Sequence, residues 1–217
     1  MKYVLVIGDG MADTALPALG GRTPLEALPL DAFDRAAGCR CGRVRTVPEG
    51  MPPGSDTAIL SIFGNDPRVC YTGRSALEAA GMGVDVPDGA ISLRVNLCAV
   101  EETPAGLVIH SHNGGNIHGE EALALMEALQ ADPAFAERMR RAQLTLHPPD
   151  AFRHIGVMRS AAHDLAAVRL TEPHNVLGQP IAPYLPHMAR ATEDAAAEKL
   201  RTDIRALMLA SYAVLKD

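Results

Sequence analysis

The chain has 217 residues, of which 47% are hydrophobic and 21% are charged, as in ordinary soluble globular proteins of one or two domains. The net charge of −6, without any block of basic residues, argues against a nucleic-acid partner. No apolar stretch approaches ~18 residues and the first predicted strand begins at the initiator methionine, so the sequence predicts a cytoplasmic protein with no membrane span and no secretory signal.

A short β-branched run, YVLVI at residues 3–7, predicts a central strand buried on both faces of a parallel sheet. Asp9 follows it between two glycines, at the carboxyl end of the strand, where open α/β sheets place their ligands. The glycines would let the backbone approach a ligand closely. Asp9 is therefore a candidate ligand-binding residue, and an Asx turn that closes the strand is the alternative interpretation.

The segment that follows carries weaker signals. Residues 14–31 are rich in glycine, proline and leucine and predict an extended loop, residues 32–37 predict a short helix, and residues 40–47 predict a strand with one wet face. The four cysteines of the chain lack the spacing of zinc knuckles or redox pairs. They are predicted to be reduced and structural.

Ser55 lies at a predicted junction between a loop and a helix. Two prolines and Gly54 break regular structure before it, and an apolar run over residues 56–63 predicts a short helix that stops at Gly64. Free N–H groups at the start of a helix favour negative charge, which suits a hydroxyl that attacks or carries a phosphoryl group. The alternative is that Ser55 only caps the helix.

The rest of the chain predicts a smaller α+β domain over residues 84–176, inserted into a partial core formed by residues 1–83 and 177–217. Glycine-rich and proline-rich segments bound this domain. A long helix over residues 191–215, apolar along one stripe, is predicted to pack back on the sheet of the core. The other predicted helices are 74–81, 120–131 and 133–142, and the predicted strands are 91–100, 107–111, 143–147, 153–159 and 167–170.

Several motifs recur in the order of one known family. VIGDGMAD at residues 6–13 and RTVPEGMPPGSDTA at residues 45–58 resemble the archaeal-type branch of the 2,3-bisphosphoglycerate-independent phosphoglycerate mutases, in the alkaline phosphatase superfamily. This resemblance implies an α/β fold, with an alkaline-phosphatase-like core interrupted by a smaller inserted substrate-binding domain. It continues through GGRTPLEA, YTGR, FRH and PH at residues 20–27, 71–74, 152–154 and 173–174.

The resemblance also implies the chemistry. Members of the family interconvert 3-phosphoglycerate and 2-phosphoglycerate, a step of glycolysis, through a phosphoserine on the enzyme. They use two divalent metal ions, Mn²⁺ or Zn²⁺, and no 2,3-bisphosphoglycerate. By this resemblance Ser55 is the nucleophile and, together with Asp9, a metal ligand.

Three residues of the inserted domain are candidates for binding the substrate. Arg153 is the first, because a planar guanidinium holds a carboxylate or a phosphate bidentately, and a structural arginine on a surface strand is the alternative. His118 and Asn113 belong to a glycine-rich loop before a predicted helix whose amides could hold an anion, and a helix-capping loop is the alternative.

The chain departs from the family pattern at Ser75-Ala76, where the family has Gly-Pro, and at Asn175, where it often has Asp. Family members continue with further metal-binding Asp and His residues, so we expect this chain to be a truncated, inactive part of such an enzyme that self-associates through an uncovered sheet edge. Two alternatives remain. One is a metal-dependent phosphatase or phosphodiesterase of the same superfamily, and the other is a non-catalytic folding unit.

Overall fold

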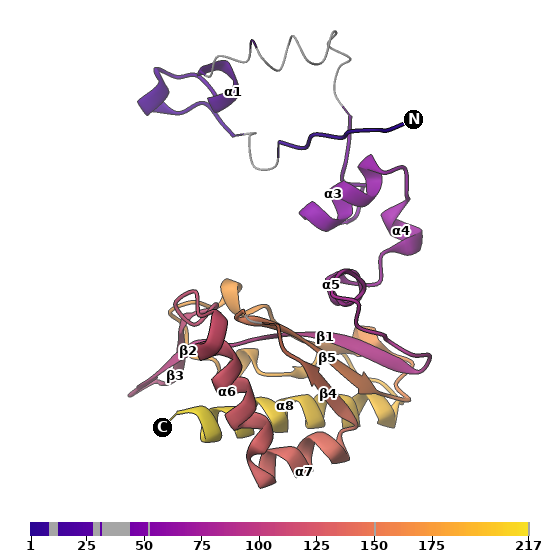
Figure 1. Cartoon of the computed structure of the whole chain (residues 1–217), viewed down its shortest axis with the longest axis vertical. Helices are drawn as coiled ribbons and strands as arrows, with labels where there is room; N and C mark the ends of the chain where they lie inside the picture. Colours follow the sequence, from indigo (N-terminus) through magenta and orange to yellow (C-terminus); the bar gives the residue numbers. More distant parts are fainter. Residues whose placement is uncertain (9–12, 28–30, 32–43, 52, 150, 217) are drawn as a thin grey trace. The chain divides into compact units, whose positions relative to one another are not determined.

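The structure is a computed structural model that describes residues 1–8, 13–27, 31, 44–51, 53–149 and 151–216. These residues form a mixed α/β protein with two compact units, residues 1–71 and residues 72–217 (Figure 1). Within the described ranges, no helix has both the length and the apolar character needed to cross a membrane.

Short helices joined by loops make up the first unit. The helix α3 (Ser55–Ile62) begins after the extended backbone of Gly54 and confirms the helix predicted over residues 56–63. It ends where Gly64 takes a left-handed φ of 82°, and the N–H of Asn65 closes the last turn on the carbonyl of Leu60 at 3.0 Å. The other described helices of this unit are η1 (Pro17–Leu19), α1 (Pro24–Ala27) and α4 (Pro67–Cys70).

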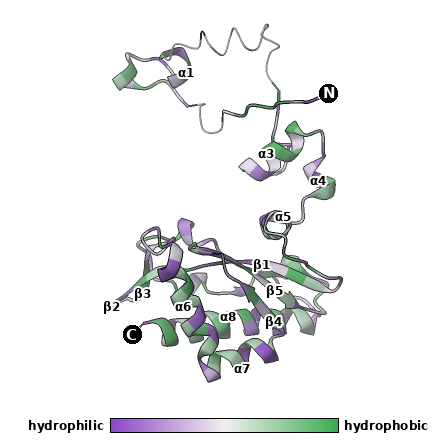
Figure 2. Ribbon diagram, viewed as in Figure 1, coloured by the Kyte–Doolittle hydropathy of each residue, from purple (hydrophilic) through white to green (hydrophobic). Residues whose placement is uncertain are grey.

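Residues 3–7 do not form the buried central strand that their sequence predicts. They have no regular secondary structure, although the segment is hydrophobic (Figure 2). Their side chains are exposed, from 40% at Ile7 to 88% at Tyr3. A β-branched run becomes a strand only where neighbouring strands accept and donate its backbone hydrogen bonds, and no described strand pairs with it. The self-association predicted from an uncovered sheet edge remains a prediction.

The strand predicted over residues 40–47 is likewise not seen in its described part, residues 44–47, where Val44 is 83% exposed. The rest of that prediction, and the helix predicted over residues 32–37, lie outside the described residues. Within the predicted loop at 14–31, the described residues include the short helices η1 and α1.

Three antiparallel strands form the central sheet of the second unit, in the order β1-β5-β4. The middle strand has the bounds that the sequence predicts, and it pairs with β1 so that Asn96 lies opposite Arg153 and Arg94 opposite Ile155. The strands of this sheet are β1 (Ala90–Asn96), β4 (Leu144–His147) and β5 (Arg153–Arg159).

Two smaller antiparallel pairs complete the strands of this unit. The predicted strand 91–100 is divided into β1 and β2, with Leu97 and Cys98 between them, and the N–H of Leu97 donates to the carbonyl of Phe152 at 2.8 Å. The pairs are β2 (Ala99–Thr103) with β3 (Gly106–Ser111), and β6 (Val168–Arg169) with β7 (His187–Met188).

Helices cover both faces of the central sheet (Figure 1). On one face, Met126 of α6 and Phe135 of α7 join a core with Leu146 and Met158 of the sheet. On the other face, Ala79 of α5 packs with alternate residues of β5. These helices, α5 (Arg74–Gly81), α6 (Gly119–Ala131) and α7 (Pro133–Arg141), confirm the predicted ones within a residue at each end, and η2 (Leu165–Ala167), η3 (Pro173–Asn175) and η4 (Ala182–Tyr184) are short additions.

The long carboxyl-terminal helix, α8 (Ala195–Leu215), ends where the sequence predicts but begins at residue 195 instead of the predicted 191, and it packs elsewhere. Its buried stripe, which includes Leu200, Ile204 and Leu207, joins the core of the second unit against α6 and α7. The prediction that it packs on a sheet of the first domain is therefore wrong for the described residues. The division into an inserted domain at residues 84–176 and a surrounding core stays a prediction.

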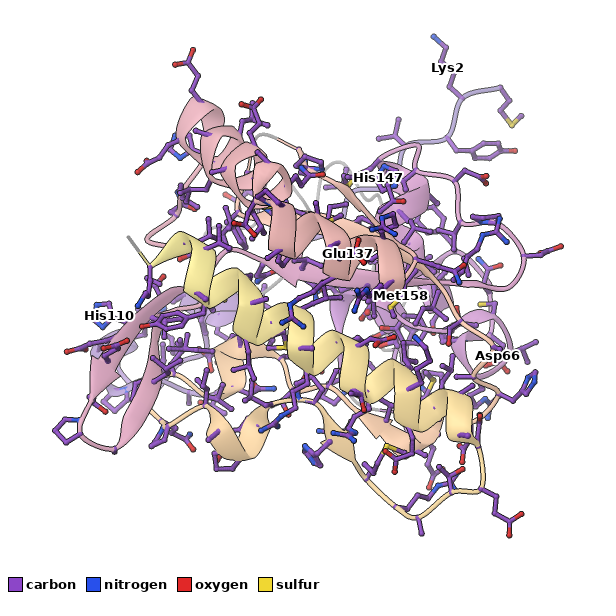
Figure 3. All side chains as sticks on the ribbon, turned by 90° about the horizontal axis from the view of Figure 1, so that it is seen from below. Lys2, Asp66, His110, Glu137, His147 and Met158 are labelled. Atoms are coloured by element: carbon purple, nitrogen blue, oxygen red, sulfur yellow. The ribbon has the colours of Figure 1, made fainter. Side chains whose placement is uncertain are left out.

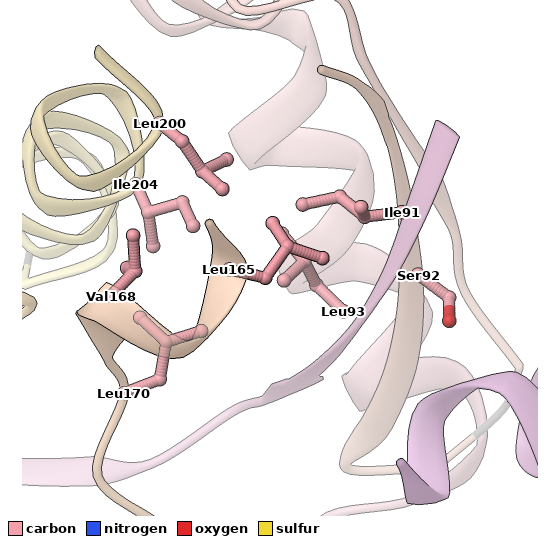
Figure 4. Close-up of a pocket in the computed structure, with 8 residues that line it drawn as sticks. All are labelled: Ile91, Ser92, Leu93, Leu165, Val168, Leu170, Leu200 and Ile204. Carbon is pink, nitrogen blue, oxygen red and sulfur yellow. The ribbon is translucent and has the colours of Figure 1, made fainter. Parts of the chain in front are cut away.

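An apolar cavity of about 130 Å³ lies beside α8 in this unit. The hydroxyl of Ser92 points away from it toward α5, where it donates to the hydroxyl of Ser75 at 3.0 Å (Figure 4). None of the described residues that line this cavity carries a positive charge that could bind an anionic substrate. Its lining consists of Ile91, Ser92, Leu93, Leu165, Val168, Leu170, Leu200 and Ile204.

His154 of β5 is fully buried, and neither ring nitrogen has a hydrogen-bond partner in the described part of the chain. Burial lowers the pKa of this imidazole from 6.5 to about 4, because the protonated ring would lose its solvation. Between these two pH values His154 binds a proton in the unfolded chain but stays neutral in the folded chain. We expect the free energy of unfolding to fall by on the order of 2 kcal/mol as the pH drops from 6.5 to 4.

The measurement is urea denaturation across this pH range for the wild type and for His154→Leu, which removes the titrating ring. The pH dependence of the variant should be smaller by that amount. His110→Leu is the matched control, since His110 is an exposed residue of β3 (Figure 3). Parallel curves for the wild type and His154→Leu would show that the ring accepts its proton in the folded state.

Candidate functional site

Ser55 occupies the first position of α3, and the structure makes Gly54, not Ser55, the N-cap. The cap residue supplies no side chain, so the alternative that Ser55 serves only as the cap is wrong. The residue is exposed, and two positions further on, the hydroxyl of Thr57 donates to the carbonyl of Gly54 at 3.0 Å. The Thr57 hydroxyl thus closes the local turn at the start of the helix.

Asp56 is the anchored residue of this turn. One carboxylate oxygen accepts from the N–H of Thr57 at 3.0 Å, and the other accepts from the hydroxyl of Tyr71, which follows α4. A side chain at position 54 would meet the first of these oxygens, so only glycine leaves room for Asp56 there. Asp56, Tyr71 and Gly54 therefore hold the amino-terminal turn of α3, with Ser55 at its exposed surface.

In the second unit, three arginines surround one glutamate. Glu78 of α5 accepts a hydrogen bond from the Nε of Arg74 at 2.9 Å through its Oε1. Its Oε2 lies 2.9 Å from the Nε of Arg94 on β1, and its Oε1 lies 3.6 Å from an Nη of Arg153 on β5. We call Arg74, Arg94 and Arg153 the arginine cluster. Glu78 is the one acidic partner that the described residues give these three arginines, so the group carries a net charge of +2 there.

Arg153 is partly buried, and the charges of Arg94 and Glu78 act on its guanidinium. The guanidinium carbon lies 5.0 Å from the centre of the Phe152 ring, and the side chain is one-third exposed. Desolvation lowers the pKa of Arg153, and the positive charge of Arg94 lowers it further, while Glu78 acts in the opposite direction. The Nε of Arg153 is buried and has no hydrogen-bond partner among the described residues. An oxyanion beside Arg153 would satisfy this donor and relieve the repulsion.

The other two predicted substrate-binding residues lie in the loop between β3 and α6, where their contacts are local. Asn113 accepts a hydrogen bond from the hydroxyl of Ser111 at 2.7 Å, and the ring of His118 lies 2.8 Å from the carbonyl of Asn116. His118 is the N-cap residue of α6 but makes no side-chain cap. Two glutamates in the first turn of α6 disfavour an anion at this end of the helix. Roles for Asn113 and His118 in substrate binding remain predictions.

The sequence did not single out Arg94, Glu78 or Arg74 as residues of the site. A signal for Arg94 was present, because Ser92, Arg94 and Asn96 alternate with apolar residues along β1 and so share one face. Glu78 lies four residues after Arg74 on α5, the spacing of an ion pair along a helix. The register that brings these residues to Arg153 is a property of the folded sheet.

The described side chains do not assemble a metal centre. Within the described ranges, no three His, Cys, Asp or Glu residues come together in a way that could hold a metal ion. Asp9, the other predicted ligand, lies outside the described residues. Ser55 and Asp9 would in any case supply only two of the four or more ligands of a tight divalent site.

Comparison with known proteins gives consistent matches along the chain. A family model described as 2,3-bisphosphoglycerate-independent phosphoglycerate mutase matches residues 36–217. A protein of Geobacter sulfurreducens, named as a probable enzyme of that kind, is 42% identical over 189 residues, which are 86% of this chain and 45% of the relative. A second relative, from Methanothermobacter thermautotrophicus, is 38% identical over all 217 residues and 48% of its own length.

A solved structure of a Pyrococcus horikoshii protein is also similar, with 30% identity and a TM-score of 0.49 over 69% of this chain and 35% of that one. The chain spans about half the length of the curated relatives that it matches.

Proposed function

The chain belongs to the 2,3-bisphosphoglycerate-independent phosphoglycerate mutase family, and we propose that it supplies the phosphate-accepting serine and an arginine seat for the substrate of such an enzyme. The proposed reaction interconverts 3-phosphoglycerate and 2-phosphoglycerate in the cytoplasm. The fold proposed with it is an alkaline-phosphatase-like core interrupted by a smaller substrate-binding domain.

The single observation that carries this proposal is the arginine cluster. In a protein with a net charge of −6, three guanidiniums converge on one carboxylate and keep two positive charges in excess. A phosphoglycerate carries a phosphate and a carboxylate, and either group matches the bidentate fork of a guanidinium. The cluster therefore supports a seat for one anionic end of the substrate, with Arg153, the one predicted from the sequence, as a member.

The position of Ser55 supports the second part of the proposal. In the proposed cycle, the Ser55 oxygen attacks the phosphorus of 3-phosphoglycerate, the bond from phosphorus to the C3 oxygen breaks, and that oxygen leaves as a hydroxyl after taking up a proton. The C2 hydroxyl then attacks the phosphoserine and loses its proton, and the Ser55 oxygen leaves. The first-turn N–H groups of α3 would stabilise the phosphoryl oxygens.

The proposal includes two divalent ions, Mn²⁺ or Zn²⁺, with Asp9 and Ser55 among their ligands and without 2,3-bisphosphoglycerate as cofactor. Such an ion would lower the pKa of a bound hydroxyl toward neutrality. Because the described side chains gather no group of three ligands, further ligands are needed beyond these two.

The test is phosphorus NMR on the natural protein that contains this chain, incubated with 3-phosphoglycerate and Mn²⁺. We expect the 2-phosphoglycerate signal to grow without inorganic phosphate. Growth of the inorganic phosphate signal instead would identify a phosphatase, in which water accepts the phosphoryl group. A spectrum that stays unchanged would favour a non-catalytic folding unit.

A further inference from the structure

Glu78 is placed to organise the arginine cluster. It comes from the middle of α5, whereas Arg94 and Arg153 come from two paired strands, and its two oxygens reach all three guanidiniums. Its side chain is only 20% exposed, so the carboxylate is held within the cluster and not spread into solvent. Ser75, next to Arg74, donates to the carbonyl of Ser92 at 2.8 Å and fixes the start of α5 on β1.

Each arginine contacts Glu78 through only one of its guanidinium nitrogens, so the other nitrogens are available to bind a ligand. Arg74 donates its Nε–H to the carboxylate, and Arg94 lies with its Nε 2.9 Å from the other carboxylate oxygen as an ion pair without a hydrogen bond among the described residues. Both contacts are made through Nε, so the terminal nitrogens of these two arginines are not used to bind Glu78. Arg153 meets Glu78 through an Nη and keeps a buried Nε without a hydrogen-bond partner among the described residues. Three guanidiniums without a shared acceptor would repel one another and separate.

We propose that Glu78 is a positioning residue, which orients the arginine cluster so that its free nitrogens converge on one oxyanion of the substrate. This inference rests on the proposed function, because it takes the cluster as the substrate seat. A carboxylate in an anion site is expected to weaken binding by its charge alone. If Glu78 instead acts by positioning the arginines, removal of its carboxylate should weaken anion binding. The two effects change the affinity in opposite directions, and this difference makes the inference testable.

The first experiment is calorimetric titration of the wild type and Glu78→Gln with 3-phosphoglycerate and with inorganic phosphate. Glutamine has nearly the same size but one acceptor oxygen in place of two, and its amide N–H groups face the donors of Arg94. We expect the dissociation constant for the bound anion to rise about tenfold, although the substitution removes one negative charge from the site. An unchanged or lower dissociation constant would overturn the inference.

Glu137→Gln is the matched control. Glu137 of α7 also pairs with two arginines, Arg140 and Arg141, but it lies on another element than the cluster (Figure 3). Its removal changes the total charge by the same amount and should leave the dissociation constant within twofold. Glu78→Asp keeps the charge but shortens the side chain, so we expect a loss of affinity here too, although no charge has changed. A full wild-type affinity in Glu78→Asp would contradict positioning.

The second experiment needs no ligand and so separates this inference from the proposed function. Nitrogen-15 correlation spectra resolve the Nε–H groups of arginines that are held in place. In the wild type, the Nε–H signals of Arg74, which donates to Glu78, and of Arg94, whose buried Nε lies 2.9 Å from Glu78, should be sharp and shifted. In Glu78→Gln they should resemble the signal of the exposed Arg138. If these signals do not change, Glu78 does not position the cluster. If they change while phosphoglycerate fails to bind the wild type, the seat serves another anion and the proposed function falls instead.

Discussion

Changing Ser55 to alanine is expected to lower mutase turnover in the natural protein that contains this chain by about 10⁴-fold or more. The reason is that alanine has no oxygen that can take the phosphoryl group and pass it to the second hydroxyl of the same substrate. The fold should be retained, because Ser55 is exposed and the N-cap of α3 is Gly54. The measurement is the initial rate of 2-phosphoglycerate formation, together with the thermal unfolding midpoint.

The matched control for this variant is Ser61→Ala. Ser61 lies on the same helix, and its hydroxyl donates to the carbonyl of Thr57 at 3.1 Å. This substitution removes the same atom from α3 and should leave turnover within a few-fold of the wild type. If Ser55→Ala retained turnover at the level of Ser61→Ala, the nucleophile would have to be another residue.

The second large effect is expected for Arg153→Lys. Lysine keeps the positive charge but replaces the planar fork by a single ammonium, which cannot bind an oxyanion bidentately or fill the place of the buried Nε. We expect the KM for 3-phosphoglycerate to rise by about 10-fold to 100-fold, as for the loss of one or two charge-assisted hydrogen bonds. Steady-state kinetics over a range of substrate concentrations measure this change.

Arg159→Lys is the control, since Arg159 is the exposed last residue of the same strand, opposite Ala90 of β1. Its KM should match that of the wild type. Equal KM values for Arg153→Lys and Arg159→Lys would mean that Arg153 acts only as a structural arginine, the alternative that its position on a strand allowed.

The local elements of the second unit were predictable from the sequence because local information decides them. The bounds of β5 agree with the prediction, and α6 departs from it by one residue at its start. In α6 the buried Ala122, Met126 and Leu129 follow the helical period, which is visible in the sequence as an apolar stripe. In α8 the buried Leu200, Ile204 and Leu207 follow the helical period in the same way.

What these elements pack against was not predictable in the same way. An apolar stripe on α8 states that one face is buried but does not say by which partner, and the partner is the core of the second unit. Residues 3–7 show the same limit, since a β-branched run needs neighbouring strands that its own sequence does not contain.

The candidate site likewise contains residues that the local sequence indicates and residues that only the folded structure brings together. Ser55 and Arg153 were predicted from motifs, because each stands in a local sequence with a recognisable pattern, and their roles remain predictions. Arg94 and Glu78 became visible only with the register of β1 on β5 and the position of α5 above them. A site made by residues from three elements depends on contacts between distant segments, which the spacing of residues along the chain does not determine.

The most direct test of the central claim is to look for the phosphoserine itself. The natural protein that contains this chain is mixed with 3-phosphoglycerate and Mn²⁺, quenched in acid within milliseconds, digested and analysed by mass spectrometry. The account predicts one phosphoryl group on Ser55 in the wild type and none on the same peptide of Ser55→Ala. Phosphate on another residue, or turnover without any phosphopeptide, would contradict it.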